Sequence, residues 1–179
     1  MPTPVIFLHG ASSSGKSTLA RAIQSVAPVP FWHLSIDHLR DSGAWPMTRF
    51  QNGSFDWSAY RALFFDGFQH MIGAVAATGN PVILEHILDE PDRLPALRAV
   101  LKNCDVLFVA LHCPLSVLQR REAERGDRQP GSAERDFQII HNGLSYDLHL
   151  SSEDPATVNA DLVLQALGQG TRSSSFSAT

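Results

Sequence analysis

The feature that most constrains this chain is the stretch GASSSGKS at residues 10–17, which fits the pattern G-x-x-x-x-G-K-S/T at every fixed position. A short apolar run at residues 5–8 precedes it and indicates a buried strand, and residues 18–23 follow with the spacing of an amphipathic helix. Glycines let the backbone curl so that several N–H groups point at one anion, and the helix N-terminus adds about half a positive charge. The sequence therefore predicts a phosphate-binding loop between a strand and a helix.

The chemistry of this loop assigns roles to its side chains. Lys16 can reach the β- and γ-phosphates of a nucleotide, and the Ser17 hydroxyl can bind Mg²⁺. ATP and Mg²⁺ are thus the expected cofactors. The alternative is a Gly/Ser loop that caps a helix, with Lys16 in solvent; the agreement of strand, loop and helix favours phosphate binding. The predicted nucleotide-binding residues of the loop are Gly10, Ala11, Ser12, Ser13, Ser14, Gly15, Lys16, Ser17 and Thr18.

Strand-like and helix-like segments alternate along the rest of the chain. This alternation predicts an α/β protein with the P-loop NTPase fold, a five-stranded parallel sheet flanked by helices. The expected domain covers residues 1–168, and the Ser/Gly-rich residues 169–179 are predicted to be a disordered tail. Further strands are expected at 31–36, 81–84, 105–111 and 146–150, and helices at 57–77, 89–102, 115–124 and 154–167.

Composition excludes several classes of partner. The net charge of −4 gives no general attraction to nucleic acid or acidic membranes. The sequence has no apolar run near the ~20 residues of a membrane span, and no basic segment precedes the first apolar run. Cys104 and Cys113 do not form a CxxC pair, which favours a reducing compartment. The predicted location is the cytoplasm.

Acidic residues follow two of the predicted strands. Because ligands bind at the carboxyl ends of strands in an open α/β sheet, Asp37, Glu85 and His86 are candidate site residues. Asp37 fits a catalytic base, a cap for a helix that begins at His38, or both. Glu85 fits the carboxylate that holds a magnesium-bound water, and His86 fits a contact to the acceptor or a place in a polar mouth.

Residues 41–56 combine loop formers with aromatic side chains, as functional loops of this length often do. Trp45 and Phe50 in this segment are candidate contacts for an apolar acceptor, whereas the aromatic residues of the helix at 57–77 are expected in the core.

Five arginines fall within sixteen residues. Glycines and a proline surround Arg125 and Arg128, which favours a lid over about residues 120–137 that brings guanidinium groups to the triphosphate. Arg121, with Glu122 and Glu124, instead fits a solvated helix face.

Together these motifs resemble the chloramphenicol phosphotransferase-like small-molecule kinases, which are relatives of shikimate kinase. The resemblance extends up to the tail. It rests on the phosphate loop, Asp37, the R-G-D-R stretch at 125–128 and H-N-G-L-S-Y-D at 141–147. It implies that Asp37 is the base on the acceptor hydroxyl and that Arg125 and Arg128 belong to a nucleotide lid. The family has two adjacent acids where this chain has Glu85 and His86.

The implied activity is transfer of the γ-phosphate of ATP to a hydroxyl of an antibiotic-like small molecule such as chloramphenicol. The alternatives are a zeta-toxin-like kinase of sugar nucleotides and a non-catalytic nucleotide-binding regulatory module. A GTP-dependent switch would need N/T-K-x-D, and a dinucleotide oxidoreductase would need G-x-G-x-x-G; the sequence contains neither.

Overall fold

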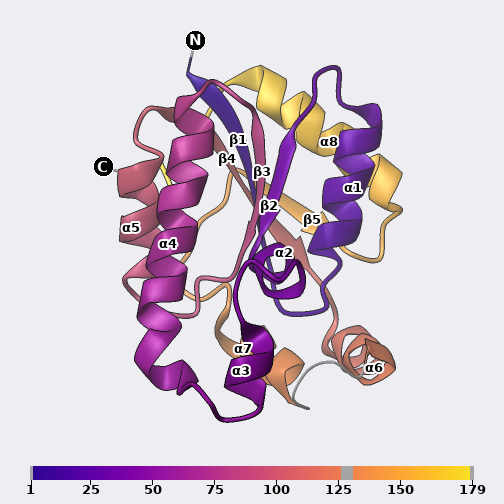
Figure 1. Ribbon diagram of the computed structural model, residues 1–179. Helices are drawn as coiled ribbons and strands as arrows, with labels where there is room; N and C mark the ends of the chain where they lie inside the picture. The colour runs from indigo at the N-terminus through magenta and orange to yellow at the C-terminus, as the bar shows by residue number, and fades with distance from the viewer. Residues whose placement is uncertain (1, 126–130, 178–179) are drawn as a thin grey trace.

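The computed structural model describes residues 2–125 and 131–177, apart from the side chain of Arg125. Within these residues the chain forms a five-stranded, fully parallel sheet in the order β2-β3-β1-β4-β5 (Figure 1). The strand that feeds the phosphate loop is buried, as the sequence predicts, and it lies at the centre of the sheet. The strands are β1 (Thr3–His9), β2 (Trp32–Ser35), β3 (Val82–His86), β4 (Cys104–His112) and β5 (Leu148–Ser151).

Helices cover both faces of the sheet. In Figure 1, α4 and α5 lie on one side of it, and α1 and α8 on the other. The described helices are α1 (Lys16–Val26), α2 (Ile36–Asp41), α3 (Met47–Gln51), α4 (Trp57–Ala77), α5 (Arg93–Val100), α6 (Leu115–Arg125), α7 (Ser132–Ile139) and α8 (Ala156–Gln169).

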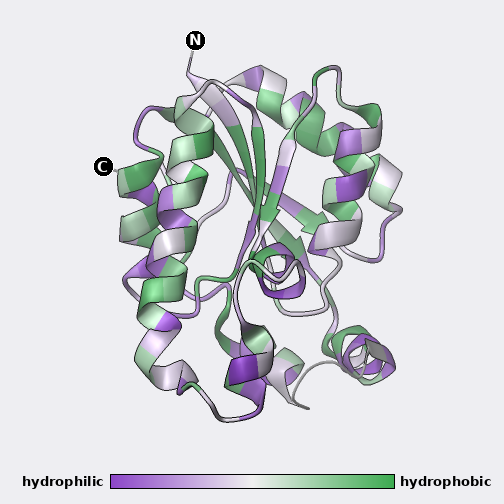
Figure 2. Ribbon diagram, in the orientation of Figure 1, coloured by the Kyte–Doolittle hydropathy of each residue, from purple (hydrophilic) through white to green (hydrophobic). Residues whose placement is uncertain are grey.

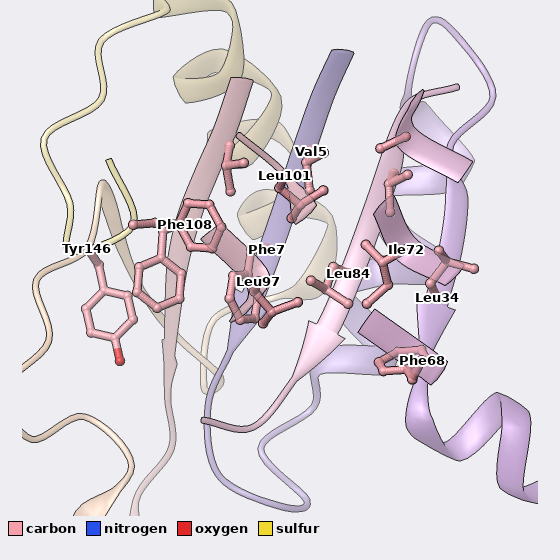
Figure 3. Close-up of a cluster of buried hydrophobic side chains, with 14 of the residues drawn as sticks. Val5, Phe7, Leu34, Phe68, Ile72, Leu84, Leu97, Leu101, Phe108 and Tyr146 are labelled. Carbon is pink, nitrogen blue, oxygen red and sulfur yellow. The ribbon is translucent and has the colours of Figure 1, made fainter. Parts of the chain in front are cut away.

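The central strand is apolar on both sides because it is buried on both sides. Phe7 faces a core that contains Phe68 and Leu97 from α4 and α5, shown in Figure 3. Leu8 faces the opposite core, which contains Leu19 of α1 and residues of α8. Hydrophobic colouring concentrates accordingly on the strands in the middle of the molecule (Figure 2).

Two loop regions contain helices that the sequence analysis missed. The segment at 41–56 includes the short helix α3, and α7 forms where no element was predicted. The second predicted strand also ends earlier, at Ser35, because the Ser35 Oγ accepts a hydrogen bond from the His38 N–H at 3.2 Å and begins α2. Ser35, and not Asp37, is therefore the cap of this helix.

The prediction of a disordered tail is wrong for residues 170–177. Phe176 is buried against Phe7 and Phe108, with ring centroids 5.9 and 6.1 Å away. The N–H groups of Ser173 and Ser174 donate to Asp147 Oδ1. One aromatic anchor and backbone hydrogen bonds thus order a segment whose composition is otherwise polar.

Candidate active site

A cleft of about 720 Å³ lies at the carboxyl ends of β1, β2 and β3. The phosphate loop, residues 10–17, forms part of its wall. The cleft brings together residues far apart in sequence, as strand-end reasoning predicts. Its lining includes residues 12–18 of the loop, the candidates Asp37, Glu85 and His86, and side chains that the sequence analysis did not assign to the site. The latter include Arg40, Phe65, Asp89, Arg121, Arg135, Asp136, Ser152 and Asn159.

The loop needs its glycines for two different reasons. A Cβ on Gly10 would stand 2.6 Å from the backbone oxygen of Leu111, so the close passage of the loop past β4 requires glycine. Gly15 has a φ of +102°, in the left-handed region that other residues rarely adopt. These two positions explain the fixed glycines of the motif in this chain.

The loop has the polar groups that an anion requires. The Nζ of Lys16 donates to the backbone oxygens of Gly10 and Ala11, each at 2.9 Å, which holds the ammonium group over the loop. Among the described residues, the buried hydroxyl oxygens of Ser13 and Ser14 have no hydrogen-bond partner. Buried polar groups normally have a hydrogen-bond partner, so these two hydroxyl groups are suited to bind a ligand. The phosphate oxygens of a nucleotide fit this requirement.

Glu85 lies next to Ser17 at the end of β3. Its Oε2 accepts a hydrogen bond from the Ser17 hydroxyl at 2.9 Å, and its Oε1 accepts one from the His33 Nε2 on β2. Burial raises the pKa of Glu85, but His33, Lys16 and Ser17 outweigh that effect and hold the pKa below its ordinary value. Glu85 is therefore an anion at neutral pH.

A hydroxyl beside a carboxylate is the oxygen donor set that Mg²⁺ uses with nucleotide phosphates. Among the described residues no group of three or more His, Cys, Asp and Glu side chains is arranged to hold a metal alone. The residues present therefore fit a magnesium ion that takes most of its oxygens from phosphates and water, with Ser17 and Glu85 as the protein side of the site.

Asp37 lies in the first turn of α2, in the lining of the same cleft. Its Oδ1 is 3.1 Å from the Nη1 of Arg40, one turn further along the helix. Arg40 also donates to Asp41 through its Nε at 2.7 Å. The carboxylate of Asp37 is thus oriented at the cleft by a neighbour that α2 itself supplies.

His86 is buried in the cleft wall between Phe65 and Phe68, with ring centroids 5.8 and 5.6 Å away. Its Nδ1 donates to the Ile87 oxygen at 2.7 Å, so the ring carries its proton there. Burial, and then the charge of Arg93, lower the pKa of His86 to about 4. The ring is therefore neutral at pH 7.

Trp45 and Phe50, predicted as acceptor contacts, do not line the cleft in the structure. Their rings stack on each other at 6.0 Å, and Trp45 packs on Phe64 of α4 at 5.2 Å. Phe65, the next residue along α4, is the aromatic side chain that reaches the cleft. The two loop aromatics form a small aromatic cluster with the start of α4 because that helix begins directly after the loop.

The prediction that Arg121 and Glu122 belong to a solvated helix face is wrong. The Arg121 Nη1 donates to the backbone oxygens of Ser13 and Ser14, at 3.4 and 3.1 Å. Glu122 accepts hydrogen bonds from the N–H groups of Gly131 and Ala133, at 3.0 and 2.9 Å, at the start of α7. Both side chains therefore fix the α6–α7 pair beside the phosphate loop.

Helix α7 contacts the loop directly. The buried Asp136 carboxylate accepts from the Ser12 N–H at 3.0 Å. Arg128 and the side chain of Arg125, the predicted lid arginines, lie outside the described residues, and the lid stays a prediction.

A second set of polar contacts connects the 141–147 stretch to β1. The Leu88 N–H donates to His9 Nε2 at 3.1 Å, so His9 carries its proton on Nδ1 and donates it to the Tyr146 oxygen at 2.7 Å. Tyr146 in turn donates to the His141 Nδ1 at 2.8 Å. Burial lowers the pKa of His9, and burial followed by the charge of His112 lowers that of His141 to about 4.

These neutral histidines predict how stability depends on pH. In the unfolded chain His86 binds a proton below about pH 6.5, whereas in the folded state it binds one only below about pH 4. The free energy of unfolding therefore falls as the pH falls from 6.5 to about 4. A shift of this size corresponds to about 3 kcal/mol at about 1.4 kcal/mol per pKa unit. Urea unfolding at pH 7 and pH 5 measures about 2 kcal/mol of this change, because pH 5 lies about 1.5 units below the ordinary pKa, and His86→Gln is expected to reduce it. Equal pH dependence in both proteins would contradict this assignment.

The phosphate loop between β1 and α1, the Glu85 carboxylate on Ser17 and the parallel sheet define a P-loop nucleotide-binding protein. The chain belongs to the family described as chloramphenicol phosphotransferase-like protein, which matches residues 3–167. It is 27% identical over 169 residues to the proposed O-phosphotransferase Rv2636 of Mycobacterium tuberculosis (strain H37Rv), covering 83% of this chain and 74% of that one.

Solved structures confirm the fold. The APS kinase CysC of Mycobacterium tuberculosis, in complex with AMPPNP and APS, superposes with a TM-score of 0.68 at 21% identity, over 93% of this chain and 98% of that one. Shikimate kinase from Acinetobacter baumannii, in complex with shikimate, gives a TM-score of 0.61 at 16% identity, over 94% of each chain. None of the described helices is long and apolar enough to cross a membrane.

Proposed function

We propose that this kinase transfers the γ-phosphate of ATP to a hydroxyl of an uncharged, antibiotic-like small molecule, of which chloramphenicol is the example. The observation that supports this most directly is that the phosphate loop and Asp37 line one cleft. A phosphoryl donor and a base for the acceptor hydroxyl then face the same space. The proposal places the protein in the cytoplasm, where ATP is available and the free thiols of Cys104 and Cys113 stay reduced.

The nucleotide end of the cleft runs from the phosphate loop toward the start of α8. The hydroxyl of Ser152 and the Oδ1 of Asn159 are buried there without partners among the described residues, and both residues line the cleft. These atoms offer hydrogen bonds to the nucleoside part of ATP. Arg121, held at the loop carbonyls, stands where it can turn toward the phosphates.

Each step of the reaction has a residue in the cleft. Asp37 accepts the proton of the acceptor hydroxyl as its oxygen attacks the γ-phosphorus, and the bond between that phosphorus and the β-phosphate oxygen breaks. Lys16 stabilises the charge on the phosphoryl group during transfer. Bound magnesium would neutralise phosphate charge beside Ser17 and Glu85. The predicted lid, about residues 120–137 with Arg125 and Arg128, would exclude water.

Charged side chains that line the acceptor end of the cleft are already paired: Arg40 with Asp37, and Asp89 with arginines from outside the lining. Arg40 contacts Asp37 at 3.1 Å, and Arg93 contacts Asp89 at 2.7 Å while its guanidinium lies 3.7 Å over the Phe65 ring. Arg61 contacts Asp89 as well, at 2.8 Å. An anionic acceptor would have to compete with Asp37 for Arg40 and would meet the carboxylate of Asp89, whereas an uncharged alcohol avoids both costs.

The test is a comparison of uncharged and anionic acceptors. We expect incubation with ATP and MgCl₂ to give a phosphate monoester, detected by mass spectrometry, from chloramphenicol or similar uncharged alcohols. Shikimate, gluconate and a UDP-sugar serve as anionic comparisons. Product from the UDP-sugar alone would favour the sugar-nucleotide kinase. ATP binding without transfer to any acceptor would favour a regulatory module.

A further inference from the structure

His33 is a buried polar residue that the reaction scheme above does not use. It lies on the edge strand β2, with 7% of its side chain exposed, and its Nε2 contacts the Oε1 of Glu85, which is also 7% exposed. The other oxygen of the same carboxylate contacts the Ser17 hydroxyl at 2.9 Å. His33, Glu85 and Ser17 thus form a continuous hydrogen-bonded row from the edge of the sheet to the phosphate loop.

The geometry of the row determines the direction of each hydrogen bond. Glu85 is ionised, so both of its oxygens accept, one from Ser17 and one from the N–H of His33. The main-chain oxygen of His33 accepts from the Nδ1 of His38 at 3.1 Å, and the two imidazole rings pack edge to face at 4.5 Å. His33 is therefore held in place by the first turns of α2, independently of any ligand.

We propose that His33 is the positioning residue of the magnesium site. By occupying Oε1, His33 fixes the rotation of the Glu85 carboxylate so that Oε2 stays at Ser17, where the metal of magnesium–ATP would be held. This inference rests on the proposed function, because it concerns binding of the nucleotide with its metal. Outer partners that orient a ligating side chain typically contribute 10- to 100-fold to metal affinity.

The signature of this role is a loss of metal dependence in nucleotide binding. In the wild type, calorimetric titration with ATP is expected to give tighter binding in excess MgCl₂ than in EDTA. The ratio that matters is the Kd for ATP in EDTA divided by the Kd in MgCl₂. His33→Ala and the bulkier His33→Phe are expected to lower this ratio about 10- to 100-fold and to leave the Kd for ATP in EDTA near the wild-type value. His33→Gln, whose amide N–H can still donate to Glu85, is expected to recover most of the ratio.

Two controls separate positioning from general damage. His70 is 71% exposed on α4, so His70→Ala is expected to keep the wild-type ratio. If His33 acts through the carboxylate, His33→Ala has no further effect on the ratio in a Glu85→Gln background. A wild-type ratio in His33→Ala and His33→Phe, or an undiminished effect of His33→Ala in that background, would overturn the inference.

The experiment also distinguishes this inference from the proposed function. If the wild-type protein binds ATP equally well with and without magnesium, the inference about His33 is wrong and the kinase assignment is unaffected. Wild-type protein that does not bind ATP under either condition would overturn both.

Discussion

Asp37→Asn is expected to bind ATP and acceptor with nearly normal Kd values and to lose about 10²- to 10⁴-fold in kcat, the usual contribution of a general base. The amide keeps the shape of the side chain at the cleft and its contact distance to Arg40, but it cannot take the proton of the acceptor hydroxyl. Transfer is measured as kcat, and both Kd values are measured by calorimetry.

The matched control for this variant lies on the same helix. Asp41 also contacts Arg40, is 64% exposed and is not part of the cleft lining, so Asp41→Asn removes the same charge without removing the base. We expect it to keep wild-type kcat. If Asp37→Asn keeps full kcat, or loses ATP binding outright, the base lies elsewhere, and Glu85 is the next candidate.

Lys16→Ala is expected to lower kcat about 10²- to 10³-fold, because the loss of one preorganised charged contact to the reacting group costs about 2.7–4 kcal/mol of barrier. The variant also loses the two hydrogen bonds to the loop carbonyls of Gly10 and Ala11. We therefore expect a lower Tm as well, with an unchanged circular dichroism spectrum.

Lys102 provides the comparison for this variant, since Lys16 and Lys102 are the two lysines of the sequence. Lys102 is exposed and lies outside the cleft, so Lys102→Ala is expected to match the wild type in kcat and Tm. Phosphate release and product formation should be followed under single-turnover conditions. If Lys16→Ala keeps the wild-type kcat, Lys16 and the phosphate loop do not take part in phosphoryl transfer.

Local patterns in the sequence were sufficient to predict the framework of the site. The strand, loop and helix around residues 10–17 are contiguous, so one motif predicts all three. The strand-end rule then predicts that Asp37 and Glu85 lie near the loop, because all described strands run parallel and their carboxyl ends share one edge.

The residues that the sequence analysis missed make contacts between distant parts of the chain. Asp136 reaches the loop across 124 residues and Arg121 across 107. His33 is a polar residue in a strand that alternates apolar and polar side chains, a pattern in which the polar residues normally face solvent. In the structure its side chain instead contacts Glu85 on the neighbouring strand. Only the strand order, with β2 beside β3, reveals the contact of His33.

The packing of Phe176 affects when the protein can complete its fold during synthesis. Translation delivers β1 first, yet the side of Phe7 and Phe108 that packs on Phe176 is covered only when residues 171–177 have left the ribosome. Because domains begin to fold from their N-terminal parts as they emerge, the sheet forms with this aromatic surface still open. Chains that lack Phe176 would leave this aromatic surface exposed to solvent, where proteases of the quality-control system can recognise it.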